Sequence, residues 1–63
     1  MDEYVVWLEI SKFQPIRKLT RYNTLEEAKY FVRTYPPGLW HLSITHYRNG
    51  EKLKTIYDWE ITH

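Results

Sequence analysis

The fold is decided by residues 41–60, which read HLSITHYRNGEKLKTIYDWE. In this stretch Asn49-Gly50 separates two runs of alternating residues, and this dipeptide is typical of a type I′ hairpin turn, in which both positions take positive φ. A two-residue loop places Arg48 opposite Glu51. The sequence therefore predicts a β-hairpin whose register is set by its turn.

Carried back along both strands without interruption, this register assigns every side chain to a face. One face receives the pairs His46–Leu53, Ile44–Thr55, Leu42–Tyr57 and Trp40–Trp59. The other face receives the pairs Tyr47–Lys52, Thr45–Lys54, Ser43–Ile56, His41–Asp58 and Leu39–Glu60. The first face is apolar and the second mostly polar, so we expect Trp40, Leu42, Tyr57 and Trp59 in the core.

An amphipathic helix precedes the hairpin. Thr24-Leu25-Glu26-Glu27 matches the capping box, in which the N-cap hydroxyl binds a free amide and the glutamate reaches back. On a helical wheel, one face collects Leu25, Ala28, Phe31, Val32 and Tyr35. Tyr35-Pro36-Pro37-Gly38 then ends the helix, because a residue that precedes proline avoids the α region.

Residues 4–10 are rich in β-branched and aromatic types and predict a first strand. We expect the side chains of Tyr4, Val6, Leu8 and Ile10 on the face that the helix covers. Val5, Trp7 and Glu9 alternate with them. Both faces are largely apolar, which indicates a central strand.

Residues 17–22 are harder to assign, since their apolar positions match neither the helical nor the strand period. We interpret them as a charged edge strand, with an extended loop as the alternative. The predicted fold class is α+β, a small antiparallel sheet with one helix packed on one face, in the order β-β-α-β-β. A β-α-β-β order follows if residues 17–22 form a loop. Residues 1–63 make a single domain.

Composition narrows the classes of protein. The chain has no cysteine, which excludes disulfides and thiolate metal sites, and its net charge of +1 does not favour a polyanion-binding tail. No secretory signal and no run of about 20 apolar residues is present. We expect a complete, soluble, cytoplasmic protein that does not associate with membranes.

Catalytic and metal sites find little support in the sequence. His41 opposite Asp58 resembles a base with its orienting acid, but a cross-strand pair is the simpler interpretation. His41 and His46 fall on opposite faces of one strand, and His63 is the last residue, so they do not form a ligand set. We expect no enzymatic activity, no cofactor and no metal.

A protein-binding face is the leading functional hypothesis. If the helix covers one face of the sheet, the other keeps Trp7, Tyr47 and Ile56 as candidate anchors, with His41 and Lys54 at the rim. A contiguous apolar patch on a small domain marks an interaction site. The occupant is then a protein partner or a second copy of the chain. The alternative is that another segment of the chain folds over this face.

The second hypothesis is weak binding of single-stranded nucleic acid. Lys12, Arg17, Lys18 and Arg21 form a run without an acidic residue between them. Cations beside exposed aromatic rings are typical of single-strand readers. Lysines and arginines also protect edge strands from aggregation, which explains the same run without a ligand.

The centre of the chain resembles many small open reading frames of phages and mobile elements. The resemblance comprises a strand, the capping segment Asn23–Ala28 (NTLEEA), a helix, and Pro37-Gly38 before a further strand. In this it is similar to the small phage-encoded inhibitors of bacterial RNA polymerase. It covers about a third of the chain and consists of capping and turn residues, so no functional residue carries over. The resemblance implies an accessory or inhibitor protein.

Overall fold

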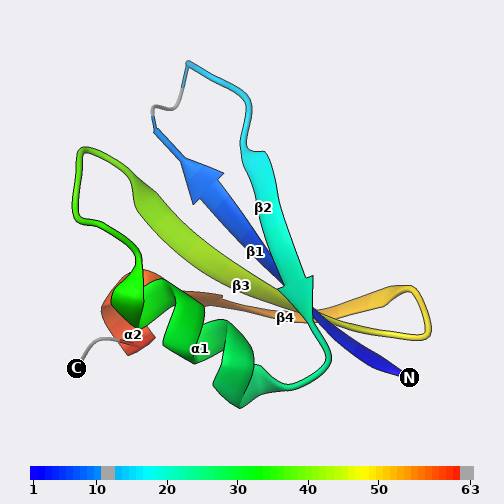
Figure 1. Ribbon diagram of the computed structural model, residues 1–63. Coiled ribbons are helices and arrows are strands. Elements are labelled where there is room, and N and C mark those ends of the chain that lie inside the picture. The colour runs from blue at the N-terminus through cyan, green and yellow to red at the C-terminus, as the bar shows by residue number, and fades with distance from the viewer. Residues whose placement is uncertain (11–12, 62–63) are drawn as a thin grey trace.

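A computed structural model describes residues 1–10 and 13–61. Its elements are β1 (Asp2–Glu9), β2 (Arg17–Tyr22), α1 (Leu25–Thr34), β3 (His41–Arg48), β4 (Glu51–Tyr57) and α2 (Asp58–Ile61). The four strands form one antiparallel sheet in the order β2-β1-β3-β4. Figure 1 shows α1 lying across one face of this sheet, with α2 beside it. The predicted α+β class and the β-β-α-β-β order are confirmed.

The two N-terminal strands occupy the predicted positions in the sheet. β1 lies between β2 and β3, which explains why both of its faces carry apolar residues. Residues 17–22 form the charged edge strand β2 and not a loop. The pairing of β1 with β2 shifts register once, between Val6 and Trp7.

The helix begins as its sequence predicts. The Thr24 Oγ1 atom accepts a 3.3 Å hydrogen bond from the Glu27 amide, and the Thr24 hydroxyl donates to Glu27 Oε1 at 2.8 Å. The side chain of Glu27 thus reaches back to the hydroxyl of the N-cap residue. Ala28 and Val32 are buried against the sheet, and Leu25, Phe31 and Tyr35 pack around them. The predicted apolar face of the helix is therefore confirmed.

The hairpin turn forms as predicted, with φ of 53° at Asn49 and 84° at Gly50. The uninterrupted register beyond it is wrong. Tyr47 pairs with Lys52, but the pairing then shifts by one residue around Leu53. From there on the pairs are His46–Lys54, Thr45–Thr55, Ile44–Ile56 and Ser43–Tyr57.

The shift has a physical cause. In the uninterrupted register Thr55 would lie opposite Ile44, which is fully buried, and Ile56 would point to the other face. The extra residue exchanges these two positions, so that Ile56 packs against the core. Full burial of an isoleucine side chain contributes about 1.5–3 kcal/mol, and the half-buried Ile56 gains part of this, which offsets the roughly 1 kcal/mol of a disrupted ladder hydrogen bond.

The C-terminal strand is also shorter than predicted. Residues 58–61 turn into α2, where the Tyr57 amide donates to Glu60 Oε2 at 2.8 Å and the Leu42 amide donates to Asp58 Oδ2 at 3.0 Å. The predicted core positions of Tyr57 and Trp59 are wrong, since these residues are 43% and 53% exposed. Ile61 takes the place in the core instead.

The core lies between the sheet and the two helices. It consists of Val6, Leu8, Ala28, Val32, Leu42, Ile44 and Ile61. Trp40 packs against it, as predicted. Ile10, expected on the same face as Leu8, is exposed beyond the end of β1. The opposite face of the sheet carries neither helix, and we call it the open face.

Candidate protein-binding surface

The open face contains a shallow groove of about 640 Å³. Its side chains come from β1, β3, β4 and α2, and from the segment that joins β1 to β2. On the sheet itself they are Trp7, Glu9, His41, Ser43, Thr45, Tyr47, Lys52, Thr55 and Tyr57. Ile10, Ile16 and Trp59 extend the groove at one end. Lys18 and Arg21 of β2 flank it on the same face, opposite Trp7 and Val5.

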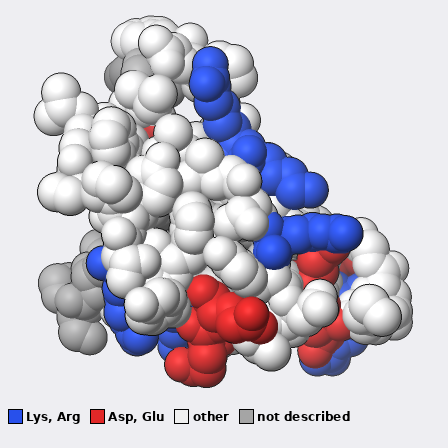
Figure 2. Space-filling view, in the orientation of Figure 1, with Lys and Arg blue, Asp and Glu red and all other residues white. Residues whose placement is uncertain are grey.

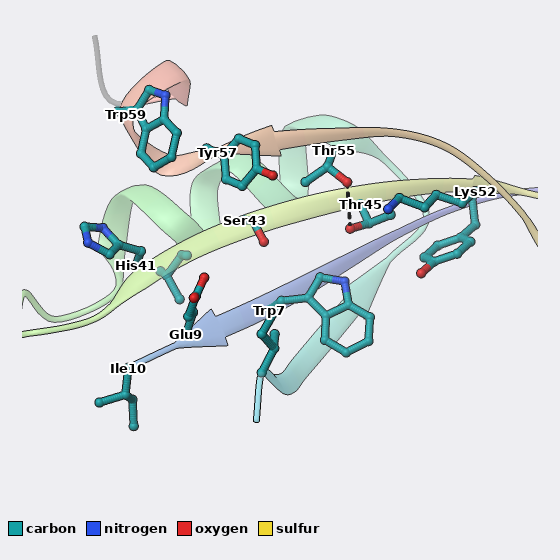
Figure 3. Close-up of a pocket in the computed structure, with 13 residues that line it drawn as sticks. Trp7, Glu9, Ile10, His41, Ser43, Thr45, Lys52, Thr55, Tyr57 and Trp59 are labelled. Carbon is teal, nitrogen blue, oxygen red and sulfur yellow. Dashed lines mark hydrogen bonds between the residues drawn. The ribbon is translucent and has the colours of Figure 1, made fainter. Parts of the chain in front are cut away.

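Strand pairing explains why these residues share a face. Trp7 lies opposite Ser43, and Glu9 lies opposite His41, in the β1–β3 ladder. On the other side of β3, the shift at Leu53 brings Thr55 and Tyr57 to this face. Figure 3 shows Trp7 on one side of the groove and Tyr57 and Trp59 on the other, with Ser43 between them. The irregularity in β4 therefore determines which rings line the groove.

One wall of the groove is a stack of aromatic rings. The rings of Tyr57 and Trp59 are parallel to within 2°, with their centroids 4.7 Å apart. His41 meets Trp59 edge to face at 6.3 Å. Stacked rings of this kind hold one another in place, so they present a large apolar surface that loses little freedom when a ligand covers it.

The floor of the groove is already closed. Thr45 lines the groove and lies opposite Val5 of β1, and each of the two is only 4% exposed although neither α1 nor α2 covers them. Thr45 Oγ1 lies 3.3 Å from Thr55 Oγ1, which satisfies two hydroxyl groups together. Trp7 and Tyr47 are half-buried at the edges of this floor. The surface thus combines a packed centre with exposed rings above it.

Charges lie at the two ends of the groove. Glu9 is at one end, beside His41, and Lys52 is at the other, opposite Tyr47. Near the Lys52 end, the guanidinium of Arg21 forms an ion pair with Glu3. Figure 3 shows the Glu9 carboxylate directed into the groove between His41 and Trp7. The middle of the groove carries no formal charge.

His41 and Asp58 come together, as the sequence suggested, but by a different geometry. His41 Nδ1 lies 3.7 Å from Asp58 Oδ2, the same oxygen that accepts the Leu42 amide hydrogen. The imidazole side chain is 71% exposed. The arrangement fastens the start of β3 to α2 and leaves the imidazole in solvent, which suits a structural contact better than a general base.

The predicted anchors divide between the two faces. Trp7, Tyr47 and His41 lie on the open face, in the groove. Ile56 packs against the core, and Lys54 lies opposite His46 on the helix-covered side. Neither of these two belongs to the groove, because the register shift moved both. Tyr57 and Trp59 take their place among the exposed rings.

A signal for this exchange was present in the sequence. In the uninterrupted register Thr55 was the polar residue in the middle of an apolar face, and Ile56 was the aliphatic residue on a polar face. Two neighbouring residues that both break the pattern indicate a one-residue bulge before them.

The predicted basic run is dispersed. Lys18 and Arg21 lie on the open face, whereas Arg17 pairs with Leu8 and points to the helix-covered side. Lys12 lies outside the described residues. Figure 2, which views the helix-covered side, shows Lys and Arg side chains along the edge formed by β2. This placement is what protection of an edge strand requires.

The described residues narrow the chemistry further. In the ranges 1–10 and 13–61, no group of three or more His, Cys, Asp or Glu side chains is placed to hold a metal ion. No helix in those ranges is long and apolar enough to cross a membrane. Comparison with protein-family models, curated proteins and solved structures found no match to this chain. Its function has to be argued from its own surface.

Proposed function

We propose that this protein is a non-enzymatic interaction module that binds a protein partner through the open face. The observation that carries the proposal is the stacked pair of Tyr57 and Trp59, exposed beside the half-buried Trp7. Tyrosine and tryptophan are the residues most enriched among those that dominate binding energy at protein interfaces. Exposed rings at the edge of a packed surface gain this binding energy when a partner covers them.

The geometry of the groove supports a macromolecular partner. It is shallow and runs along the strands, with uncharged side chains in the middle and charges at the ends. Protein interfaces have this arrangement, in which a core depleted of charge is surrounded by a polar rim. An accessory or inhibitor role, which the resemblance to small phage proteins implies, is compatible with a surface of this type.

Affinity purification with matched variants tests the proposal. The tagged protein is compared with the variants Tyr57→Ala and Trp59→Ala, and with Tyr30→Ala as the control. Tyr30 is 68% exposed on the outer side of α1, away from the open face. We expect captured protein, including untagged copies of the chain itself, to decrease at least tenfold for the two groove variants and to remain unchanged for the control. Equal capture by all four proteins would contradict the proposal.

Binding of single-stranded nucleic acid remains the second candidate function from the sequence. It is weakened because the basic residues that would contact the phosphates are dispersed over both faces of the sheet. A titration of labelled single-stranded oligonucleotide at low salt addresses it directly. Binding through Lys18 and Arg21 predicts an affinity that falls steeply as salt rises and that is lost in Lys18→Ala. Because Arg21 is already engaged by Glu3, we expect no such binding.

A further inference from the structure

We propose that the partner of the open face is a second copy of this chain, packed face to face and antiparallel. The inference rests on the proposed function, since it names the protein that the open face binds. Three properties of the face carry it: its size, the distribution of its uncharged residues, and the position of Glu9 and Lys52, the charged residues that line its groove.

The size of the face suits a stable dimer. The molecule measures 33 × 25 × 17 Å. The product of its two longer dimensions is roughly 800 Å², which is about the area that each partner contributes to a standard protein interface. Two sheets that pack in this way bury their facing side chains in a layer about 10 Å thick.

The uncharged residues lie where the centre of a symmetric interface would be. Ser43, Thr45 and Thr55 are small, and Thr45 and Thr55 already share a hydrogen bond. Trp7 and Tyr57 rise on either side of them. Small side chains between two ridges of rings let the ridge of one copy enter the depression of the other, and a two-fold axis makes each such contact occur twice.

The charges of Glu9 and Lys52, at opposite ends of the groove, determine how the two copies are oriented. Glu9 is level with His41, and Lys52 is level with Tyr47 and Glu3, which lies six residues before Glu9 on β1. At about 3.3 Å per residue the two ends are about 20 Å apart. Within the described part of the chain, no ion pair joins Glu9 or Lys52 to another residue.

A two-fold axis that lies in the plane of the face and crosses the strands reverses the two ends. The Glu9 end of each copy then lies over the Lys52 end of the other, and the pairing occurs twice. An axis along the strands would instead bring the two Lys52 ends together. Electrostatic complementarity of this kind selects one orientation from the alternatives.

The small size of the domain favours the same partner. A chain of 63 residues buries a small core, and domains of this size commonly gain stability from disulfides, metals or oligomerisation. This chain has no cysteine. Covering Trp7, Tyr57 and Trp59 with a second copy extends the apolar interior across the sheet.

Sedimentation equilibrium on the full chain, over a range of concentrations, tests the inference. We expect the mass to rise from 7.8 kDa to twice that value as concentration increases. Glu9→Lys and Lys52→Glu should each raise the dimer Kd about tenfold or more, because each sets like charges against each other twice. The double variant Glu9→Lys/Lys52→Glu should restore the wild-type Kd. Glu26→Lys, the same charge change on α1, is the control.

Several outcomes overturn the inference. A monomer at every concentration contradicts the second copy, and single reversals without effect, or a double variant that fails to restore association, contradict the antiparallel arrangement. Circular dichroism establishes that each variant folds. If a charge reversal unfolds the chain, Trp59→Ala replaces it, with weakened association expected.

The same measurements separate this inference from the proposed function. A wild-type monomer whose groove variants still lose a captured protein shows that the open face binds a different partner, so that only the second copy is wrong. A dimer that persists unchanged in the combined Tyr57→Ala/Trp59→Ala variant places the contact elsewhere and contradicts the inference, and it contradicts the proposed function as well when the captured protein is also unchanged.

Discussion

The indole of Trp40 lies directly over the α-carbon of Gly38. A Cβ atom built at Gly38 would approach Trp40 Cζ2 to 2.5 Å, which is closer than atoms pack. The indole has little room to move, because it also meets Tyr35 edge to face at 5.9 Å. Glycine is required here because of a close approach, and not because of its backbone angles.

Gly38→Ala should therefore destabilise the fold by about 1–3 kcal/mol, as overpacking does elsewhere. Chemical denaturation followed by tryptophan fluorescence measures this cost. Leu39→Ala, at a neighbouring position that is 92% exposed, should change stability by no more than about 0.5 kcal/mol. If Gly38→Ala and Leu39→Ala had equal effects, the indole would not lie where the structure has it.

Asp2 fastens β1 to β3 near the hairpin. Its Oδ1 atom accepts a 2.9 Å hydrogen bond from Arg48 Nε and lies 3.4 Å from His46 Nε2. The Arg48 guanidinium is the main cause that lowers the pKa of the Asp2 carboxyl below its ordinary value of 3.8; desolvation opposes this shift, and His46 adds to it. A lowered pKa means that the ionised form is stabilised by folding.

The lowered pKa of Asp2 determines the direction in which the stability of the fold changes with pH. The Asp2 contribution is fully present above pH 3.8 and is lost as pH falls through the lower pKa of the folded state. We expect Asp2→Asn to be less stable than the wild type near neutral pH and to match it in acid. Urea unfolding at a series of pH values measures the difference. In an Arg48→Ala background this difference should shrink, and an undiminished difference would contradict the assignment of its cause.

At the scale of elements, β4 decides which rings are exposed. Leu53 is the residue at which the ladder shifts, and it is itself 47% exposed. Every side chain after it faces the opposite way from an uninterrupted hairpin. The composition of the open face thus depends on one extra residue in one strand.

Deleting Leu53 discriminates between the two registers. In the structure described here, the deletion removes the bulge and leaves Ile56 opposite Ile44, so stability should change by no more than about 1 kcal/mol. In an uninterrupted register the same deletion would turn Tyr57 out of the core and cost several times more. Thermal unfolding by circular dichroism gives the answer, and a deletion variant that fails to fold would contradict the bulged register.

The elements differ in how far their sequences determine them. The turn at Asn49-Gly50 and the capped helix after Thr24 are local, because their own residues satisfy the backbone, and both could be predicted. The position of β1 at the centre of the sheet also follows from its two apolar faces.

The errors lie where distant packing outweighs local pattern. The bulge at Leu53 depends on what Ile44 needs opposite it, and α2 depends on a place in the core for Ile61. Neither requirement can be read from residues 51–61 alone. Of the candidate site residues, Trp7, Tyr47 and His41 lie in the groove, whereas the sequence pattern assigned Tyr57 and Trp59 to the core and Ile56 to the surface.

In the whole molecule the described elements form two layers, and none of the elements within residues 1–10 and 13–61 covers the second side of the sheet. Helices α1 and α2 enclose the core on one side. The other side has a packed floor at Val5 and Thr45 and exposed rings at its edge. We propose that this open face, with Tyr57 and Trp59, is the surface by which the protein binds, and that its partner is a second copy of the chain.

The three tryptophans make this claim measurable, because each occupies a different place: Trp7 and Trp59 line the groove, and Trp40 packs against the core under the helix. Fluorine NMR of the protein labelled with fluorotryptophan follows all three rings as the concentration is raised by about two orders of magnitude. We predict that the resonances of Trp7 and Trp59 shift together while that of Trp40 stays constant. A constant Trp59 resonance, or a Trp40 resonance that moves with the others, would contradict the account.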